Sequence, residues 1–379
     1  MRLFRPHRAD DVLTPDLCVI GAGAAGCAAA LTGVALGAAT VIVEAERPGG
    51  ERVAFDAPFA VWREAARRRA ESGRGEAWAR IAARARQAAA RAQASCSAER
   101  LAAAGGRLIA GHARFVAPDA LSVGGVAIAA RRFIVATGRA PVLPTLPGLD
   151  LLRPLSPADA LALAGMPDRL AILGAGATGL ALAQTFARLG ARVIVVDRGP
   201  ALRELAREFA DPALRRLRAE GVEIREEAAV AGVEPVGGEG AARLLLTDGE
   251  SVEASHLVVA AGWRANVEGL GLETTGARSG PEGMAVRGDL RSAARRIFVA
   301  GAAAAGAAPD AEGAARAGRL AARAALHGLR GDARLDAAPD VWPLDPAVAR
   351  LGVDRRPPNA ALAGPRVLRA SFGEDDAAF

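Results

Sequence analysis

The chain of 379 residues is long enough for two to three domains, and 51% of its residues are apolar. Its 48 basic residues are all arginine, and the formal net charge is +6. Arginine-rich stretches such as Arg67–Arg69 lack the interleaved aromatic residues of nucleic-acid-binding surfaces. They predict solvated helix faces and no nucleic-acid partner.

The N-terminal residues argue against export. Met1–Asp16 contain charges and prolines but no apolar stretch typical of a signal peptide. The three cysteines, Cys18, Cys27 and Cys96, are separated and form no CxxC motif, which fits a reducing compartment. We therefore expect a cytoplasmic protein in which Cys18 and Cys27 serve packing.

Residues 17–43 carry no charge, and the run is long enough to span a bilayer. The run is rich in glycine and alanine, however, and a glycine turn interrupts it. A strand at Leu17–Ile20, a helix from Ala24 to about Leu36 and a strand at Thr40–Val43 explain the same residues better. We therefore expect no membrane span.

Gly21, Gly23 and Gly26 form a GxGxxG run between the first strand and the helix, and Glu44 lies 23 residues beyond the first glycine. In this pattern the first glycine makes a tight turn, and the second lets the backbone approach a pyrophosphate. The third lets the helix pack on the strand. The helix N-terminus attracts phosphates, and the acid accepts hydrogen bonds from a ribose.

The same pattern recurs at Gly174, Gly176 and Gly179 after a strand at Leu170–Leu173, and Asp197 again lies 23 residues beyond the first glycine. One such run is weak evidence in a chain this rich in glycine, and both runs also fit simple turns. Two runs with matching context favour two dinucleotide sites. They predict electron transfer between two cofactors.

Three further apolar strands are expected to end in small-residue turns that let the backbone approach a flat ligand. They are Phe133–Ala136 before Thr137 and Gly138, Val258–Val259 before Gly262, and Ile297–Ala300 before Gly301.

These strands and the two glycine runs resemble the flavin-dependent pyridine nucleotide-disulfide oxidoreductases. The resemblance is closest to the mercuric-reductase-like branch and extends from about Asp16 to the C-terminus. It rests on motifs in matching order and spacing: Ser97–Leu101, Gly111–Val116, Ala136–Gly138 and Ala183–Gly190.

The resemblance implies an α/β fold with two Rossmann-like three-layer dinucleotide-binding domains and the start of an α+β interface domain. An FAD-binding domain is expected at residues 1–148 plus 285–330. An NAD(P)-binding domain at 149–284 is inserted between those parts, and a partial dimerisation domain follows at 331–379.

The resemblance also implies the cofactor-binding residues, while no catalytic side chain and no metal site are expected. FAD would be held by Gly21, Gly23, Gly26, Glu44, Gly50, Ala113, Thr137, Gly138 and Gly301. NAD would be held by Gly174, Gly176, Gly179, Asp197, Arg198, Val230 and Gly262. Asp197 favours NADH because a carboxylate repels a 2′-phosphate, whereas Arg198 leaves NADP as the alternative.

The departures from the family pattern are as informative as the matches. Arg52 and Ala57 occupy the two positions of the family's redox cysteines, and Val61 replaces a lysine. Ala181 replaces a glutamate after the second glycine run, and Ala302 replaces an aspartate that contacts the flavin's ribityl chain. The family's His–Glu pair has no counterpart among the four histidines.

The expected function is therefore an FAD-dependent NAD(P)H oxidoreductase that passes hydride to the flavin and on to a small-molecule acceptor without an active-site disulfide. A homodimer with an incomplete interface is the expected assembly. The alternative is a catalytically degenerate or truncated relative that keeps the fold as a nucleotide-binding scaffold.

Overall fold

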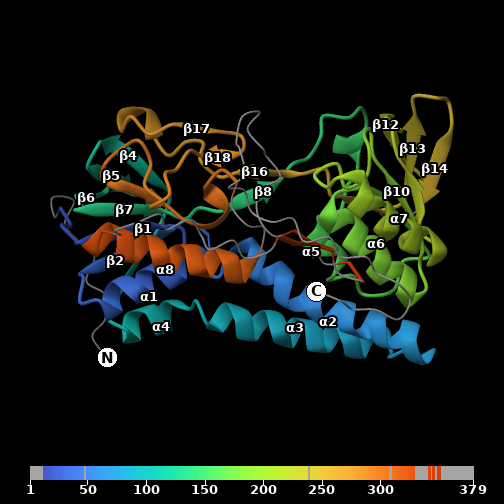
Figure 1. The fold of residues 1–379 in the computed structure, drawn as a ribbon, viewed down its shortest axis with the longest axis horizontal. Coiled ribbons are helices and arrows are strands. Elements are labelled where there is room, and N and C mark those ends of the chain that lie inside the picture. The colour runs from blue at the N-terminus through green and yellow to red at the C-terminus, as the bar shows by residue number, and fades with distance from the viewer. Residues whose placement is uncertain are drawn as a thin grey trace, which may run out of the picture.

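The computed structural model describes residues 12–46, 48–237, 240–306, 310–328, 340–342, 344–345 and 348–350. Two α/β units lie side by side, and the long helices α2 (Gly50–Ser72) and α3 (Trp78–Ala94) run beneath both (Figure 1). The expected fold with two Rossmann-like units is confirmed.

The first unit is built on a five-stranded sheet of order β19-β7-β1-β2-β3, in which every strand pair is parallel. Strand β1 (Leu17–Ile20), helix α1 (Ala24–Ala35) and strand β2 (Thr40–Glu44) match the expected bounds to within a residue. The other strands are β3 (Arg107–Ala110), β7 (Arg132–Val135) and β19 (Ile297–Val299).

Alternate residues of these strands enter different cores, as the two-residue period of a strand requires. Leu17 and Val19 pack with α1 and with α8 (Ala311–His327) on one face. Cys18 and Ile20 pack on the other face with a three-stranded antiparallel sheet. That small sheet consists of β4 (Ala113–Ala117), β5 (Ala120–Val123) and β6 (Val126–Ile128).

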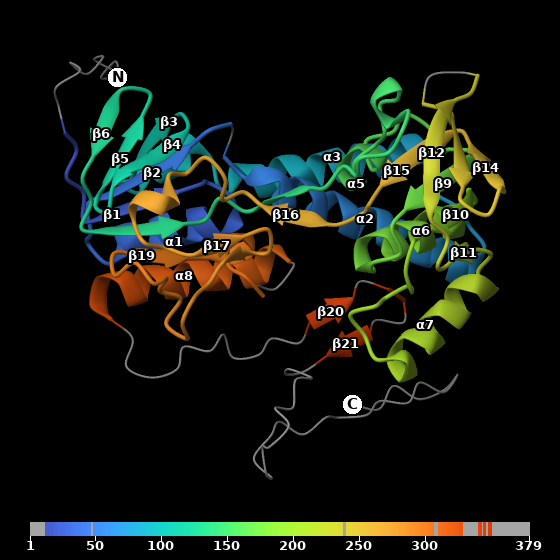
Figure 2. The same cartoon turned by 90° about the horizontal axis from the view of Figure 1, so that it is seen from above.

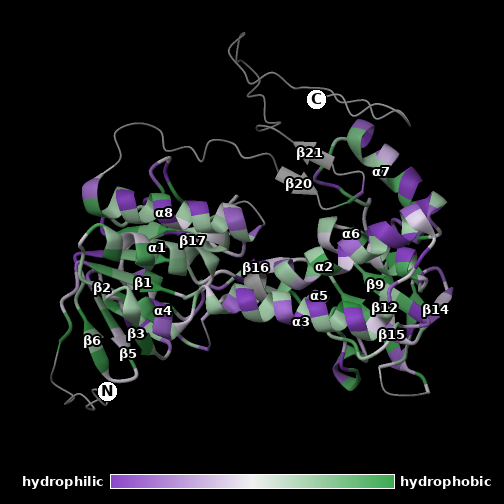
Figure 3. Cartoon of the chain, turned by 90° about the horizontal axis from the view of Figure 1, so that it is seen from below, coloured by the Kyte–Doolittle hydropathy of each residue, from purple (hydrophilic) through white to green (hydrophobic). Residues whose placement is uncertain are grey.

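The second unit repeats this plan on a parallel sheet of order β11-β10-β9-β15. Its strands and helices are β9 (Arg169–Leu173), α6 (Ala177–Leu189), β10 (Arg192–Val196), α7 (Arg207–Ala219), β11 (Glu223–Arg225) and β15 (His256–Val259). A second antiparallel sheet covers one face, with β12 (Val230–Pro235), β13 (Ala242–Leu246) and β14 (Ser251–Ala254). Figure 3 shows apolar central strands and polar outer helix faces in both units.

The chain returns to the first unit earlier than expected. Strand β16 (Trp263–Ala265) pairs antiparallel with β8 (Arg139–Pro141), and the Phe115 N–H donates to the Leu270 carbonyl oxygen at 2.7 Å. Val267, Leu270, Leu272 and Met284 are buried in the first unit's core. The short strands β17 (Ser279–Gly280) and β18 (Gly283–Met284) pair antiparallel, and β17 lies beside this unit (Figure 2). We therefore propose that the inserted unit ends near residue 262 rather than at 284.

Helices α2 and α3 tie the two units together. The indole N–H of Trp62 donates to the Leu161 carbonyl oxygen at 3.1 Å, and that of Trp78 donates to the Leu163 carbonyl oxygen at 2.9 Å. Both acceptors follow the short helix α5 (Pro157–Ala160) of the second unit. The Trp78 ring also lies 6.0 Å from that of Phe186 on α6. A single helix, α2, thus begins beside the first glycine turn and ends against the second unit.

The described part of the C-terminal segment docks on the second unit. It forms a hairpin of β20 (Asp340–Trp342) and β21 (Val348–Arg350), and Leu344 between them is buried in the second unit's core. Much of the expected partial domain at 331–379 lies outside the described residues. The remaining short helix is α4 (Ala98–Ala103), and no described helix combines the length and apolarity of a bilayer span.

A buried ionic network holds this segment in place. The Arg188 guanidinium donates to both carboxylate oxygens of Glu220, at 2.7 and 2.8 Å, and to Asp345 Oδ2 at 2.5 Å. The Gln184 side chain also accepts from the Asp345 N–H at 2.8 Å. The side chains of Arg188 and Glu220 are only 7% and 13% exposed.

Replacing Arg188 with leucine should lower the free energy of unfolding of the second unit by about 3 kcal/mol, because Glu220 keeps its charge in a largely buried site. Urea denaturation followed by the fluorescence of Trp62 and Trp78 measures the change. The matched control is Arg192→Leu, because Arg192 pairs with Asp168 where both side chains are more than two-thirds exposed. That variant should lose about 0–1 kcal/mol. Equal losses in the two variants would contradict this role of the network.

Candidate functional site

The first glycine turn is fastened to the end of strand β2 by a carboxylate. Glu44 Oε2 accepts a hydrogen bond from the Ala22 N–H at 2.5 Å, and Oε1 accepts one from the Glu46 N–H at 3.0 Å. The side chain of Glu44 therefore lies at the turn, where the sequence places a ribose-binding acid.

The second glycine turn repeats this arrangement. Asp197 Oδ2 accepts from the Ala175 N–H at 2.7 Å, and Oδ1 accepts from the Gly199 N–H at 2.9 Å. Arg198 is exposed directly beside it. The predicted acid of each unit is thus brought to its own turn, in the same relation to the backbone.

The first glycine of each turn is required by both backbone conformation and space. Gly21 has φ +98° and Gly174 has φ +115°, a region that residues with a side chain rarely adopt. A Cβ atom on Gly21 would lie 2.5 Å from the Ala136 carbonyl oxygen, and one on Gly174 would lie 2.3 Å from that of Ala260. Each first strand therefore passes directly against the neighbouring strand's end.

The second and third glycines serve different purposes. A Cβ on Gly26 would lie 1.8 Å from the Gly21 carbonyl oxygen, and one on Gly179 would lie 2.0 Å from that of Gly174. These third glycines let the helix touch its own turn. A Cβ on Gly23 or Gly176 would meet no atom within 4 Å. The second glycines thus face open space at the helix N-terminus, where a phosphate would bind.

Ala113 and Val230 occupy equivalent places at the outer edge of the two sites. Ala113 begins β4, two residues after Gly111, whose N–H donates to the Glu44 carbonyl oxygen at 2.8 Å. Val230 begins β12, two residues after Ala228, whose N–H donates to the Asp197 carbonyl oxygen at 2.8 Å. Both lie beside the acid of their unit, which fits the adenosine end of a dinucleotide.

Thr137 and Gly138 follow strand β7 at the first site. The buried Oγ1 of Thr137 has no hydrogen-bond partner within the described structure, so it is oriented as a donor or acceptor for another group. Asn266 supports this turn, because its side chain donates to the Thr137 carbonyl oxygen at 3.1 Å and its N–H donates to that of Gly138 at 3.0 Å. Gly262, with φ +130° and open space at Cβ, lies three residues after the end of β15 in the second unit.

Gly50 and Gly301 also come to the first turn. A Cβ on Gly50 would lie 3.1 Å from the Gly23 Cα, and one on Gly301, which has φ +64°, would lie 2.8 Å from the Ala25 Cβ. Ala302 is half-buried beside Gly301, where the family pattern has a carboxylate. All nine residues predicted for FAD therefore surround one turn and its neighbouring strand ends.

Ala57, at the second of the family's redox-cysteine positions, lies on α2 and is half-buried. The side chain of Arg52 lies outside the described residues. Two buried phenylalanines flank Ala57 on this helix, Phe55 and Phe59, whose rings stack with centroids 5.0 Å apart.

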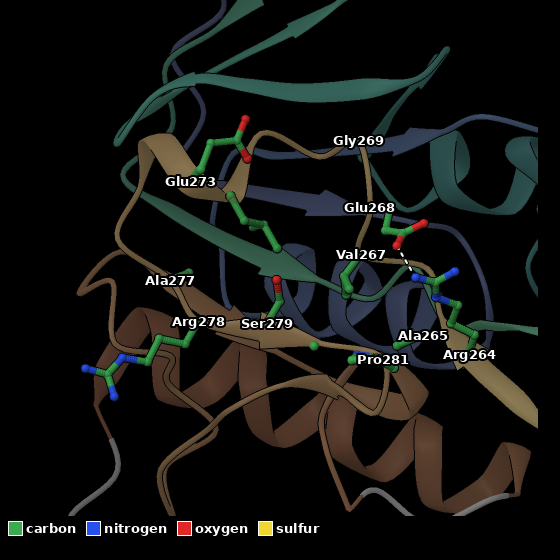
Figure 4. A pocket seen from close by; sticks show the side chains of 12 residues that line it. Arg264, Ala265, Val267, Glu268, Gly269, Glu273, Ala277, Arg278, Ser279 and Pro281 are labelled. Carbon is green, nitrogen blue, oxygen red and sulfur yellow. Dashed lines mark hydrogen bonds and ion pairs between the residues drawn. The ribbon is translucent and has the colours of Figure 1, made fainter.

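A pocket of about 500 Å³, which the sequence did not predict, is lined by residues between Arg264 and Pro281 (Figure 4). Arg264 and Glu268 form an ion pair on its wall, and Arg278 and Ser279 contribute further polar groups. The glycine- and proline-rich run at 276–283 was the available signal for such an irregular wall. Asn266 was also missed, because its role depends on a contact with a residue 129 positions away.

Comparison with known proteins agrees with this geometry. The family model "Pyridine nucleotide-disulphide oxidoreductase" matches residues 15–327. The mercuric reductase of Streptomyces lividans is 37% identical over 185 residues, covering 48% of this chain and 39% of that protein. Dihydrolipoyl dehydrogenase 3 of Pseudomonas aeruginosa is 33% identical over 273 residues, covering 68% of this chain and 56% of that protein. The matched region thus spans about two fifths of the length of the mercuric reductases.

Solved structures show the same fold. LpdA from Mycobacterium tuberculosis superposes with a TM-score of 0.77 at 27% identity, covering 90% of this chain and 78% of that one. The flavoprotein disulfide reductase RclA from Escherichia coli, solved as a Cu(II) complex, superposes with a TM-score of 0.78 at 22% identity, covering 89% and 77%. Because the family model covers most of its length, the chain belongs to the pyridine nucleotide-disulphide oxidoreductases, a family that uses FAD and NAD(P)H.

Proposed function

We propose that the protein is an FAD-dependent NAD(P)H oxidoreductase that works without an active-site disulfide and delivers electrons to a small-molecule acceptor. The observation that carries this proposal is the duplicated site: two glycine turns, each fastened by a carboxylate and each with an open second glycine. The membership of the family supports it.

The residues at the first turn fit FAD. The open space at Gly23 and the N-terminus of α1 suit its pyrophosphate, and Glu44 suits its ribose. The unpartnered Oγ1 of Thr137 offers one further hydrogen bond. Ala302 supplies no carboxylate, and the lost charged hydrogen bond weakens affinity by about 1.5–3 kcal/mol. We expect the contacts at Gly23, Glu44 and Thr137 to retain FAD despite this loss.

The residues at the second turn fit NADH. Gly176 leaves space for the pyrophosphate, and Asp197 suits the adenosine ribose. A 2′-phosphate would approach the Asp197 carboxylate closely, which disfavours NADPH. Arg198 is near enough in sequence to compensate, so NADPH is the alternative donor.

When bound, the two cofactors supply hydride transfer from nicotinamide to flavin, and the protein supplies orientation and exclusion of water. Helices α2 and α3 hold the two units together through Trp62 on α2 and Trp78 on α3. No side chain is required to move a proton in this step.

We further propose that the protein forms homodimers, as members of the family typically do, and resides in the cytoplasm, which its free, buried cysteines fit.

A pair of glycine variants tests the FAD site. Gly23→Ala should leave the first unit folded but weaken FAD binding at least about tenfold, because the methyl group would occupy the pyrophosphate's space. Gly26→Ala should destabilise the unit itself, because its Cβ would collide with the Gly21 carbonyl oxygen. Circular dichroism and bound flavin per protein separate the two effects. Gly176→Ala is the matched control and should retain FAD; an unchanged FAD content in Gly23→Ala would contradict the placement.

The choice of nucleotide rests on Asp197. We expect bound flavin to be reduced faster by NADH than by NADPH, and Asp197→Ala to lose about 1.5–3 kcal/mol of NADH affinity. Stopped-flow reduction measures both, with Asp168→Ala as a control for an exposed carboxylate on the same unit. Faster reduction by NADPH would reverse the assignment, and Arg198→Ala would then remove that preference.

Lipoamide, oxidised glutathione and mercuric ion should not be turned over, because Arg52 and Ala57 stand where thiols would be needed. Oxidation of NADH in the presence of each substrate is the assay, and free flavin gives the background rate. Turnover far above that background would show that another thiol pair reaches the flavin.

A further inference from the structure

Two buried cysteines that the proposed function does not use lie against each other behind the first glycine turn. Cys27 lies in the first half of α1, and Cys96 lies in the turn between α3 and α4. The Cys27 Sγ lies 3.9 Å from the Cys96 carbonyl oxygen, and the two thiols lie close enough to shift each other's pKa. Both are reduced, and they are 2% and 6% exposed.

The two thiols are chemically unequal. The neighbouring Cys27 thiol, the hydrogen bond from the Ser95 hydroxyl and the positive charge of Arg100 lower the pKa of Cys96 to about 7 despite its burial. The neighbouring Cys96, burial and the nearby Glu44 raise the pKa of Cys27. Near neutral pH, Cys96 is therefore the nucleophile of the pair, whereas Cys27 stays protonated.

Cys96 is also the sulfur closer to solvent. Both cysteines belong to the same buried core, but Cys96 is 6% exposed against 2% for Cys27, and it follows the exposed Ser95 in a short turn. Cys18 provides a contrast within the same chain. It is fully buried in strand β1, and burial raises the pKa of its thiol to about 12.

We propose that Cys27 and Cys96 are a redox-modification site that forms an intramolecular disulfide when hydrogen peroxide oxidises the protein. The Cys96 thiolate attacks one peroxide oxygen, the O–O bond breaks, and the departing hydroxide takes a proton to become water. The resulting Cys96 sulfenic acid is attacked by the Cys27 sulfur. The S–S bond forms, the S–O bond breaks, and the Cys27 proton leaves with the hydroxyl group as a second water. The two sulfurs lose two electrons, and the peroxide gains them.

Disulfide formation would change the first glycine turn. The Cys27 thiol donates to the Ala22 carbonyl oxygen at 3.0 Å, and a disulfide sulfur has no hydrogen to donate. That carbonyl would keep only its hydrogen bond from the Gly49 N–H, at 2.8 Å. The site thus couples the state of a thiol pair to the turn, and it does not depend on whether FAD binds there.

Peptide mapping of the oxidised full-length protein tests the proposal. The reduced protein is treated with hydrogen peroxide, denatured, alkylated and digested. We expect two of the three thiols to become protected, a peptide pair joined through Cys27 and Cys96, and full recovery with dithiothreitol. Cys18→Ser is the control and should form the same linkage. Over-oxidation of Cys96 without a linked peptide, or a disulfide that includes Cys18, would overturn the proposal.

A second measurement needs no oxidant. In Cys27→Ala, the pKa of Cys96 should return toward about 8.5, so its alkylation by iodoacetamide at pH 7 should slow roughly tenfold. Cys18→Ala should leave the rate unchanged. Equal rates in the wild-type protein and Cys27→Ala would show that the two thiols are not coupled, which contradicts the assigned roles.

Discussion

A carboxylate at the end of the second strand of each unit fastens the glycine turn that follows the first strand. Glu44 holds the Ala22 N–H, and Asp197 holds the Ala175 N–H. The hydrogen bonds are possible only because Gly26 and Gly179 let each helix lie against its own turn without a Cβ. The close approach of helix and turn leaves open space at the helix N-terminus beside Gly23 and Gly176. The same interaction that closes the fold therefore shapes the two sites.

The relation between the two sites depends on a different set of contacts. Helix α2 starts beside Gly23 and packs on the second unit through Trp62, while the chain returns through β16 to pair with β8. Both connections are hydrogen-bonded and partly buried, so the two units are held from two sides. This fixed relation between the units suits chemistry that depends on the orientation of two cofactors more than on a general acid or base.

The sequence was sufficient to predict the elements around each glycine turn, because local periodicity and turn chemistry act there together. The bounds of β1, α1 and β2 agree to within a residue, and the predicted acids lie at their turns. The return of residues 265–284 to the first unit could not be read from the sequence, since it depends on packing against Phe115 and Phe133, which are far away in the chain. The contact of Asn266 with Thr137 and that of Cys27 with Cys96 could not be predicted for the same reason. Each joins segments far apart in the chain.

Anaerobic titration of the purified protein with NADH, followed by visible absorption, tests the central claim most directly. We expect flavin bands in the purified protein, or after incubation with FAD. About one equivalent of NADH should bleach these bands directly, with no disulfide reduced beforehand. A protein that stays colourless in the presence of excess FAD, or whose flavin NADH does not reduce, would contradict the account and leave a family member that keeps the fold as a nucleotide-binding scaffold.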